Sequence, residues 1–204
     1  MSLDISEHLT AIETAINAGG NIWENELLSD LKSKVKEYYR EKLNEQCCYC
    51  RKNTHGEFKM VLDIEHILPK SKFRHFMFHT YNLSVSCKRC NMNIKREDFS
   101  FVKDIDAATI DGNNGALYKL IHPNLDDYFS HIEYYTQTVN QQKIIKYKVI
   151  ADSSKGQFTY NYFKLSELEI DTINTAQGIK KGEELSEAID PEIAKRIEKL
   201  LKNK

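Results

Sequence analysis

The chain has 204 residues, of which 41% are hydrophobic and 29% charged, a composition typical of a soluble globular protein. This length predicts one domain with elaborations, large enough to bury a core without covalent cross-links. No apolar run approaches the roughly 20 residues that a membrane span needs, and the N-terminal stretch lacks the apolar core of a secretory signal. We therefore expect a cytoplasmic protein with no membrane partner.

The formal net charge is only −1, but the charge is unevenly distributed. Between Lys32 and Lys103 there are 16 Lys and Arg residues against 8 Asp and Glu, a balance of +8, while the rest of the chain carries −9. A concentrated basic segment attracts phosphates locally, because salt screens charges beyond about 10 Å at 0.1 M. The segment is therefore either a nucleic-acid-binding region or a solvated surface of uneven charge.

Helical spacing of apolar residues predicts two helices in the N-terminal part of the chain. The first covers 5–18, with one apolar face and a stop at Gly19-Gly20. The second runs from about 24 to 45 and has a basic polar face, with which it either braces the segment that follows or contacts a nucleic-acid backbone; we favour bracing. The residues expected on the two apolar faces are Leu9, Ile12 and Ile16, and then Leu28, Leu31, Val35, Tyr38 and Leu43.

The central segment predicts the order strand, loop, strand, helix. Apolar and polar residues alternate over 58–66, which is typical of a strand, and Pro69 ends it. The apolar stretch 83–86 predicts the second strand, and the residues from Cys90 onward predict a helix. Farther along, 143–150 and 158–163 are predicted as strands from their Ile, Val, Tyr and Phe content. Two later helices are predicted, one opened by a capping box at Ser166-x-x-Glu169 and one over 192–202 after Asp190-Pro191.

Four of the five cysteines form two Cys-x-x-Cys pairs, a pattern that in a reducing compartment indicates a metal site before a disulfide. Two such pairs suit tetrahedral Zn²⁺, and a site of four thiolates has no open position, so this zinc is expected to be structural. A redox dithiol is the competing interpretation, but it needs only one pair. The expected ligands are Cys47, Cys50, Cys87 and Cys90. Cys48 is left over, and we interpret it as a spectator although a Cys48-x-Cys50 spacing is also present.

Between and after these pairs lie Asp63-Ile64-Glu65-His66-Ile67-Leu68-Pro69-Lys70, then Asn82-Leu83, then Cys90-Asn91 and Lys95. This combination resembles the HNH endonuclease family over about 50 residues, from Cys47 to Lys95. The resemblance implies an α+β fold, in which a ββα-metal core with a structural zinc knuckle is embedded in N- and C-terminal, mainly helical extensions. The expected divisions are an N-terminal helical extension (1–46), the nuclease module (47–103) and a C-terminal α/β extension (104–204).

The resemblance also implies roles for individual residues. His66 is the expected general base, because a neutral imidazole can take a proton from water near physiological pH. Asn82 is expected to hold the loop and orient the His66 ring. Glu65 and Asn91 are the expected ligands of a catalytic Mg²⁺ or Mn²⁺, which oxygen donors suit. The residues expected to bind nucleic acid are Lys70 and Lys95. DNA is the expected substrate, with 5′-phosphate and 3′-hydroxyl products.

Two features depart from the simplest form of this pattern. Glu65 stands where Asp is more frequent, and Asn91 where many members carry His, which leaves the choice of catalytic metal open. In addition, adjacent strand residues face opposite sides, so Glu65 and His66 can converge only if the strand ends or bulges there.

The segment His122-Pro123-Asn124-Leu125-Asp126-Asp127 with His131 is similar to one in bacterial HNH proteins of phage-defence systems, the Septu-type and retron-associated nucleases. That similarity implies an ATPase partner and a function in anti-phage defence. The alternative is a non-catalytic zinc module that binds nucleic acid or a protein. The set of Glu65, His66 and Asn91 favours the nuclease, because a binding module does not need it.

Overall fold

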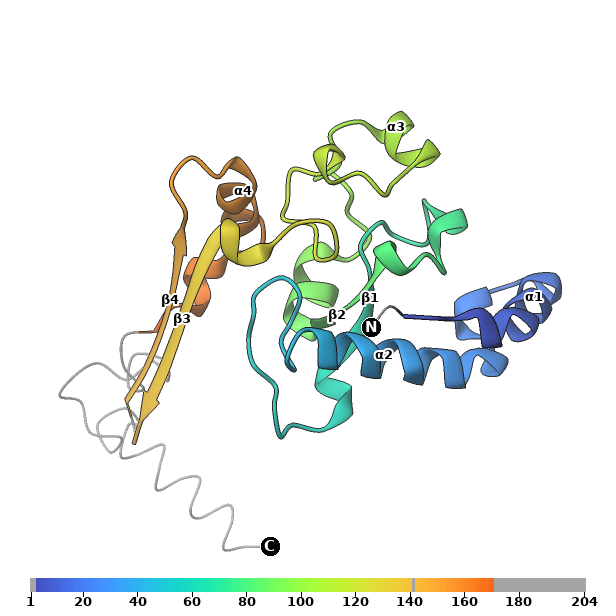
Figure 1. Cartoon of the computed structure of the whole chain (residues 1–204), viewed down its shortest axis with the longest axis horizontal. Helices are drawn as coiled ribbons and strands as arrows, with labels where there is room; N and C mark the ends of the chain where they lie inside the picture. The colour runs from blue at the N-terminus through green and yellow to red at the C-terminus, as the bar shows by residue number, and fades with distance from the viewer. Residues whose placement is uncertain (1–2, 141, 171–204) are drawn as a thin grey trace, which may run out of the picture. The chain divides into compact units, whose positions relative to one another are not determined.

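The computed structural model describes residues 3–140 and 142–170 and has a mixed α+β fold with two small sheets (Figure 1). The chain divides into two compact units, Met1–Glu133 with Lys148–Ser166, and Tyr134–Tyr147 with Glu167–Lys204. The helices are α1 (Leu9–Ala18), α2 (Ser29–Lys42), α3 (Ile105–Ile110) and α4 (Ser154–Tyr162). The strands are β1 (Leu62–His66), β2 (Leu83–Cys87), β3 (Ile132–Val139) and β4 (Gln142–Val149). None of the described helices is long and apolar enough to cross a membrane.

The two predicted N-terminal helices are present, but their buried faces differ from the expected ones. In α1 the buried residues are Ile12 and Ala15, whereas Leu9 and Ile16 are exposed. Helix α2 is shorter than predicted, because two 3-10 turns, Ile22–Glu24 and Glu26–Leu28, precede it. Its buried face contains Tyr39 in place of the predicted neighbour Tyr38.

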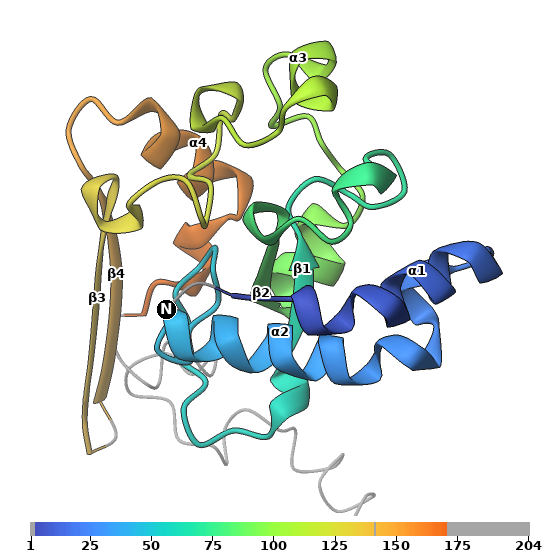
Figure 2. The ribbon, with the colours of Figure 1, turned by 45° about the vertical axis from the view of Figure 1, so that its right-hand side comes forward.

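Helix α2 packs against both β1 and β2 (Figure 2), which agrees with the bracing function that we favoured. Leu31 and Val35 are almost completely buried on the packed face. Burial of such side chains stabilises the contact by about 1.5–3 kcal/mol each.

Strands β1 and β2 form an antiparallel pair in which Leu62 lies opposite Cys87 and His66 opposite Leu83. The strand predicted over 58–66 is therefore too long. Residues Lys59–Val61 form a 3-10 turn, and the side chains of Phe58 and Met60 are 70% and 66% exposed. The alternating pattern begins at Phe58, before the residues that pair with β2. Only the later part of the pattern, Leu62–His66, therefore forms a ladder.

The helix predicted after the second strand is a seven-residue π-helix, Arg89–Lys95. At its end the amide N of Arg96 donates to the carbonyl O of Asn91, five residues earlier, at 2.8 Å. The predicted order of strand, loop, strand and helix is therefore confirmed. π-Helical turns are rare and occur frequently at functional sites.

The C-terminal predictions have mixed outcomes. Strand β4 confirms the strand predicted over 143–150, and β3, its partner, was not predicted. The strand predicted over 158–163 is wrong, because residues 158–162 lie in α4 and Phe163 caps its end. The helix begins where the Ser153 hydroxyl O accepts from the amide N of Gly156. The predicted capping box does not form: the carboxylate of Glu169 accepts from the amide N of Tyr147 at 3.0 Å. The helix predicted over 192–202 lies outside the described residues.

Candidate functional site

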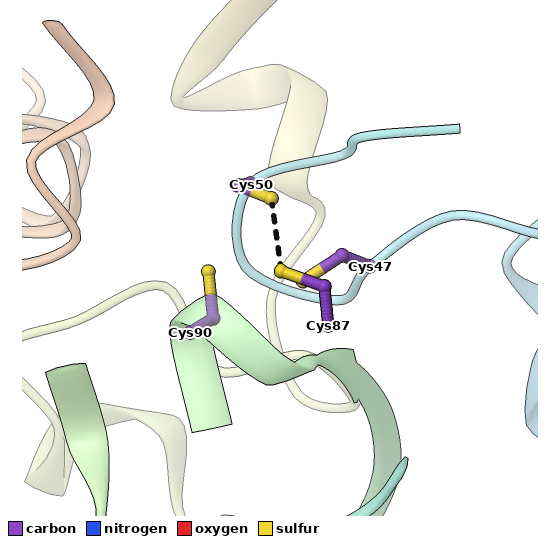
Figure 3. Close-up of side chains that lie close together, drawn as sticks. All are labelled: Cys47, Cys50, Cys87 and Cys90. Atoms are coloured by element: carbon purple, nitrogen blue, oxygen red, sulfur yellow. Dashed lines mark hydrogen bonds between the residues drawn. The ribbon is translucent and has the colours of Figure 1, made fainter. Parts of the chain in front are cut away.

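The four cysteines of the two pairs gather into one buried cluster (Figure 3). Their sulfur atoms all lie within 4.8 Å of one another, and those of Cys50 and Cys87 are 3.8 Å apart. A tetrahedral ion with Zn–S bonds of about 2.3 Å separates its sulfur ligands by about 3.8 Å. The predicted cysteines are therefore positioned to hold a metal ion such as zinc.

Each pair occupies a tight turn of the backbone. In the first, the amide N of Arg51 donates to the carbonyl O of Cys47 at 3.0 Å, and Arg51 adopts the left-handed conformation with φ of 55°. In the second, Cys87 is the last residue of β2, and Cys90 lies in the first turn of the π-helix. The cluster thus joins the loop after α2 to the connection between β2 and the π-helix.

Cys48 is not part of the metal-binding group. Its amide N donates to the carbonyl O of Val85 at 3.0 Å, which docks the first turn against β2. Burial raises the pKa of the Cys48 thiol well above its ordinary value, so the side chain stays a neutral thiol. These contacts agree with the interpretation of Cys48 as a spectator.

A pocket of about 210 Å³ lies in the same compact unit, at the end of the β1–β2 pair that carries His66. It is lined by five residues that the sequence singled out: Glu65, His66, Lys70, Asn91 and Lys95. Four charged or aromatic residues that the sequence did not single out also line it: Trp23, Glu24, Arg96 and Glu97. The adjacent residues Glu65 and His66 both line this pocket, and β1 ends at His66, the condition that their adjacency set.

Glu65 is the most buried acidic group of this pocket, with an exposed fraction of 1%. Its Oε1 accepts from the Tyr49 hydroxyl at 3.1 Å and lies 2.7 Å from the Lys95 Nζ, and its Oε2 accepts from Ser86 at 3.3 Å. Burial raises the pKa of the Glu65 carboxyl, and the ammonium of Lys95 opposes that rise. The charge of Lys95 therefore favours the ionised carboxylate despite its burial.

Lys95 is itself only 1% exposed. Besides pairing with Glu65, its Nζ donates to the backbone carbonyl O of His66 at 2.9 Å. The ammonium therefore ties the π-helix to the end of β1, an arrangement that differs from the phosphate contact expected from the sequence.

The oxygen donors of the pocket suit a divalent cation in kind. Mg²⁺ is commonly held by one or two carboxylates, with waters and phosphate completing its shell, and Glu65 and Asn91 together offer a carboxylate and an amide oxygen. A carboxylate has about four acceptor positions, of which the three contacts described above use three. A cation at Glu65 would therefore join or replace these contacts.

His66 is held at the edge of the pocket by its surroundings. Its Nε2 lies 3.1 Å from the carbonyl O of Met77, and the Trp23 indole packs edge-on against its ring, with centroids 4.4 Å apart. A carbonyl only accepts, so Nε2 carries the proton and Nδ1 keeps a free lone pair. Burial, and then the charge of Lys70, lower the pKa of His66 to about 3, so the imidazole is neutral at pH 7.

Asn82 is fully buried and holds the loop that connects β1 and β2. Its Oδ1 accepts from the amide N of Leu68 at 2.7 Å, and its Nδ2 donates to the carbonyls of Leu68 and Phe76 at 3.2 and 3.1 Å. The carbonyl that bonds the His66 ring belongs to Met77, the residue after Phe76. Asn82 thus acts on the loop directly and on the His66 ring only through it.

Residues of the segment 122–131 form hydrogen bonds and an ion pair that hold parts of the fold together. The carboxylate of Asp126 accepts from the amide N of His122 at 2.7 Å and pairs with Lys155 Nζ at 2.6 Å. Asn124 donates from Nδ2 to the carbonyls of Tyr81 and Leu83, at 2.9 and 2.7 Å, on either side of Asn82. The segment therefore clamps the start of β2.

Sequence reasoning missed two residues that shape this site. Tyr49 lies inside the first Cys-x-x-Cys pair, and an aromatic residue in a tight metal turn was an available signal. Trp23 lies outside every motif, and its only signal was its being the single tryptophan of the chain.

The chain is similar to the Septu protein PtuB of Bacillus thuringiensis, with 30% identity over 87 residues. The match covers 43% of this chain and 31% of that relative, so less than a third of the relative's length is represented. No protein-family model matches the chain, and no solved structure does.

Proposed function

We propose that the protein is a metal-dependent HNH endonuclease that hydrolyses phosphodiester bonds of DNA, leaving 5′-phosphate and 3′-hydroxyl ends. The observation that carries this proposal is the meeting of Glu65, His66 and Asn91 in one polar pocket. A neutral imidazole can take a proton from water, and a carboxylate with an amide oxygen can hold a divalent cation, which are two contributions that speed hydrolysis of a phosphodiester. The four-cysteine cluster holds structural zinc in this proposal and takes no part in the reaction.

His66 acts as the general base through Nδ1, since Nε2 is bonded to the carbonyl of Met77. Its lowered pKa keeps it unprotonated at neutral pH, and a phosphate entering beside Lys70 offsets the lowering that this ammonium causes. When bound by Glu65 and Asn91, Mg²⁺ or Mn²⁺ would stabilise the charge on the transition state and on the leaving O3′.

Lys70 and Arg96 line the pocket and hold the phosphate by charge. Lys95 contributes by fixing Glu65 and the carbonyl of His66, in addition to the positive potential it adds. Contacts of this kind with the phosphate position the DNA and carry no sequence information.

The biological setting that we propose is anti-phage defence in the cytoplasm, together with an ATPase partner. The similarity to the Septu protein PtuB supports it, as does the segment 122–131, whose contacts clamp β2. In this proposal Trp23 and Glu24 of the N-terminal extension line the pocket of the predicted nuclease module, 47–103. Asn124 of the C-terminal extension holds the start of its strand β2.

The test is cleavage of supercoiled plasmid with Mg²⁺ or Mn²⁺ by the wild type and by His66→Ala. We expect the variant to cut at least about 100-fold more slowly, the size of a lost general base. The matched control is His75→Ala, since His75 lies on the same loop, is exposed and bonds the carbonyl of Thr109 away from the pocket. Ligation of the products reports the 5′-phosphate.

Equal cutting by the wild type and His66→Ala, at equal zinc content, would overturn the mechanism.

The pairing of Glu65 with Lys95 favours the alternative, a non-catalytic zinc-binding module. That alternative predicts DNA or protein binding, without cleavage under any divalent metal, even when the ATPase partner is supplied.

A further inference from the structure

Trp23 belongs to a part of the chain far in sequence from the other residues of the pocket. It lies in the 3-10 turn Ile22–Glu24, before α2, and its side chain lines the pocket beside His66. The two rings meet edge to face, with centroids 4.4 Å apart and planes at 83°. Trp23 and His66 are 6% and 8% exposed, so water is largely excluded from this contact.

Trp23 also contacts the loop that supplies the hydrogen-bond acceptor of His66. Its indole lies 5.9 Å, between centroids, from the ring of Phe78. Phe78 directly follows Met77, whose carbonyl O lies 3.1 Å from the His66 Nε2. One indole therefore touches both the imidazole and the segment that holds it.

Trp23 is in turn fixed to α2. The Nζ of Lys32 lies 6.0 Å from the centroid of the indole, and it pairs with Glu24 at 3.8 Å. Ile22, the preceding residue, is buried. The turn that carries Trp23 is thus attached to α2 through Lys32, so it can act as a fixed wall.

A single hydrogen bond does not fix an imidazole, because the ring can still tilt about its Nε2 contact. An edge-to-face aromatic partner favours one orientation of the ring and restricts this tilt. Misplacing a catalytic group by about 1 Å costs about 10²-fold in rate. We propose that Trp23 is a positioning residue for His66, which together with the Met77 carbonyl holds the imidazole in one orientation and one tautomer.

The consequence for catalysis rests on the proposed function, whereas the ring geometry does not. The experiment therefore has two readouts on the full-length, zinc-loaded chain. Long-range ¹H–¹⁵N spectra of the imidazole report the tautomer, with the His66 signals assigned by their loss in His66→Gln. Plasmid cleavage at varied DNA concentration separates kcat from KM.

The variants are Trp23→Phe, which keeps an aromatic ring, and Trp23→Leu, which does not, with Trp23→Met as a second non-aromatic variant should the leucine variant not fold. The matched control is Ile22→Ala, which removes a neighbouring buried side chain but keeps the contacts of Lys32 with the turn and does not line the pocket. Thermal unfolding of every variant reports the stability that each has lost.

We expect the wild type, Trp23→Phe and Ile22→Ala to show the Nε2-protonated tautomer, and the non-aromatic variants to show averaged ¹⁵N shifts. The non-aromatic variants should lower kcat about tenfold or more with little change in KM, and phenylalanine should restore most of it. Unchanged His66 spectra in the non-aromatic variants overturn the proposal, as does an equal kcat loss in Ile22→Ala. A wild type that does not cleave overturns the proposed function alone, because the spectra still decide the position of the ring.

Discussion

The four-cysteine cluster and the His66 pocket lie at opposite ends of the same strand pair, since Cys87 faces Leu62 and Leu83 faces His66. The cluster is built from four identical soft ligands, all buried, and leaves no position for a substrate. The pocket combines a carboxylate, an imidazole, an amide and cations around an open volume. A closed set of ligands holds a structure together, whereas an open one permits chemistry.

The two regions are joined by the residues next to the cysteines. Tyr49, between Cys47 and Cys50, donates to Glu65, and the π-helix that begins around Cys90 also carries Asn91 and Lys95. A metal bound by the cluster would therefore order one wall of the pocket through its direct chain neighbours. The predictions that follow test how far the two regions depend on each other.

Removal of the metal from the cluster is expected to have the largest effect. Structural zinc supplies about 10–16 kcal/mol of apparent binding free energy in zinc-finger peptides, as much as the whole stability of a typical domain. Chelation at pH 7, or Cys90→Ser, should therefore abolish cooperative unfolding in calorimetry. Cys48→Ala should keep one zinc per chain by elemental analysis, and the reverse result would show that the cluster has been wrongly assigned.

Breaking the buried ion pair of Glu65 and Lys95 in the pocket is expected to cause the second-largest loss of stability. Lys95→Met leaves the Glu65 carboxylate buried without its cation, which costs about 3–5 kcal/mol. The double variant Glu65→Gln, Lys95→Met should recover much of this loss in urea unfolding, because it removes the charge as well. Lys88→Met, which breaks an exposed pair with Asp63, should cost at most about 1 kcal/mol. Equal losses in both lysine variants would contradict the buried pairing.

Substitution of Asn82, in the loop between β1 and β2, should cause a smaller loss of stability. Asn82→Ala removes the three hydrogen bonds to Leu68 and Phe76, and each buried group left unpaired costs about 1–3 kcal/mol. Part of this is regained from water, so we expect a total of about 2–3 kcal/mol and faster hydrogen exchange at the Leu68 amide. Asn82→Asp keeps the acceptor for that amide and should protect it. A Leu68 amide that exchanges equally in both variants would argue against the loop-holding contact.

A fall in pH from neutrality should have the smallest effect on the stability of the fold. Part of this effect arises from His122, which lies outside both regions. Burial lowers the pKa of His122 to about 3, against about 6.5 for an unfolded histidine. Above pH 6.5 the imidazole is neutral in both states. As pH falls below 6.5 the unfolded state gains a proton that the folded state binds only near pH 3, so stability is lost through that window, by about 2 kcal/mol at pH 5.

His122→Asn removes this titrating group, and its stability should fall less steeply between pH 6.5 and 5 than that of the wild type. The comparison is made by urea unfolding at each pH, with the zinc content held constant. The remaining slope then includes the contribution of His66 in the pocket, whose pKa is also lowered by burial. Identical slopes would mean that His122 is not buried as a neutral group.

The sequence predicted the cluster and the short strand β2 because both depend on local pattern and spacing. It failed at Phe58 and Met60, whose alternation has no partner strand, and at 158–163, where aromatic residues suggested a strand. There Ser153 caps a helix, and Phe163, just beyond its end, stacks on Tyr49 at 4.2 Å. Such long-range packing overrides local propensity and cannot be read from a window of sequence.

For the site, the sequence named the residues that line the pocket but not their partners. The pairing of Lys95 with Glu65 depends on where the π-helix places the lysine, and the contact of Trp23 with His66 joins positions 43 residues apart. Motif spacing carries no information on such contacts, because they arise only when the elements pack.

The place of Trp23 has an optical consequence. It is the only tryptophan of the chain, so the indole emission of the unlabelled protein originates beside His66. A paramagnetic ion such as Mn²⁺, or a nucleotide stacked or docked in the pocket, should quench or shift that emission. Occupancy of the pocket can thus be followed by fluorescence titration, even in His66 variants that no longer cleave.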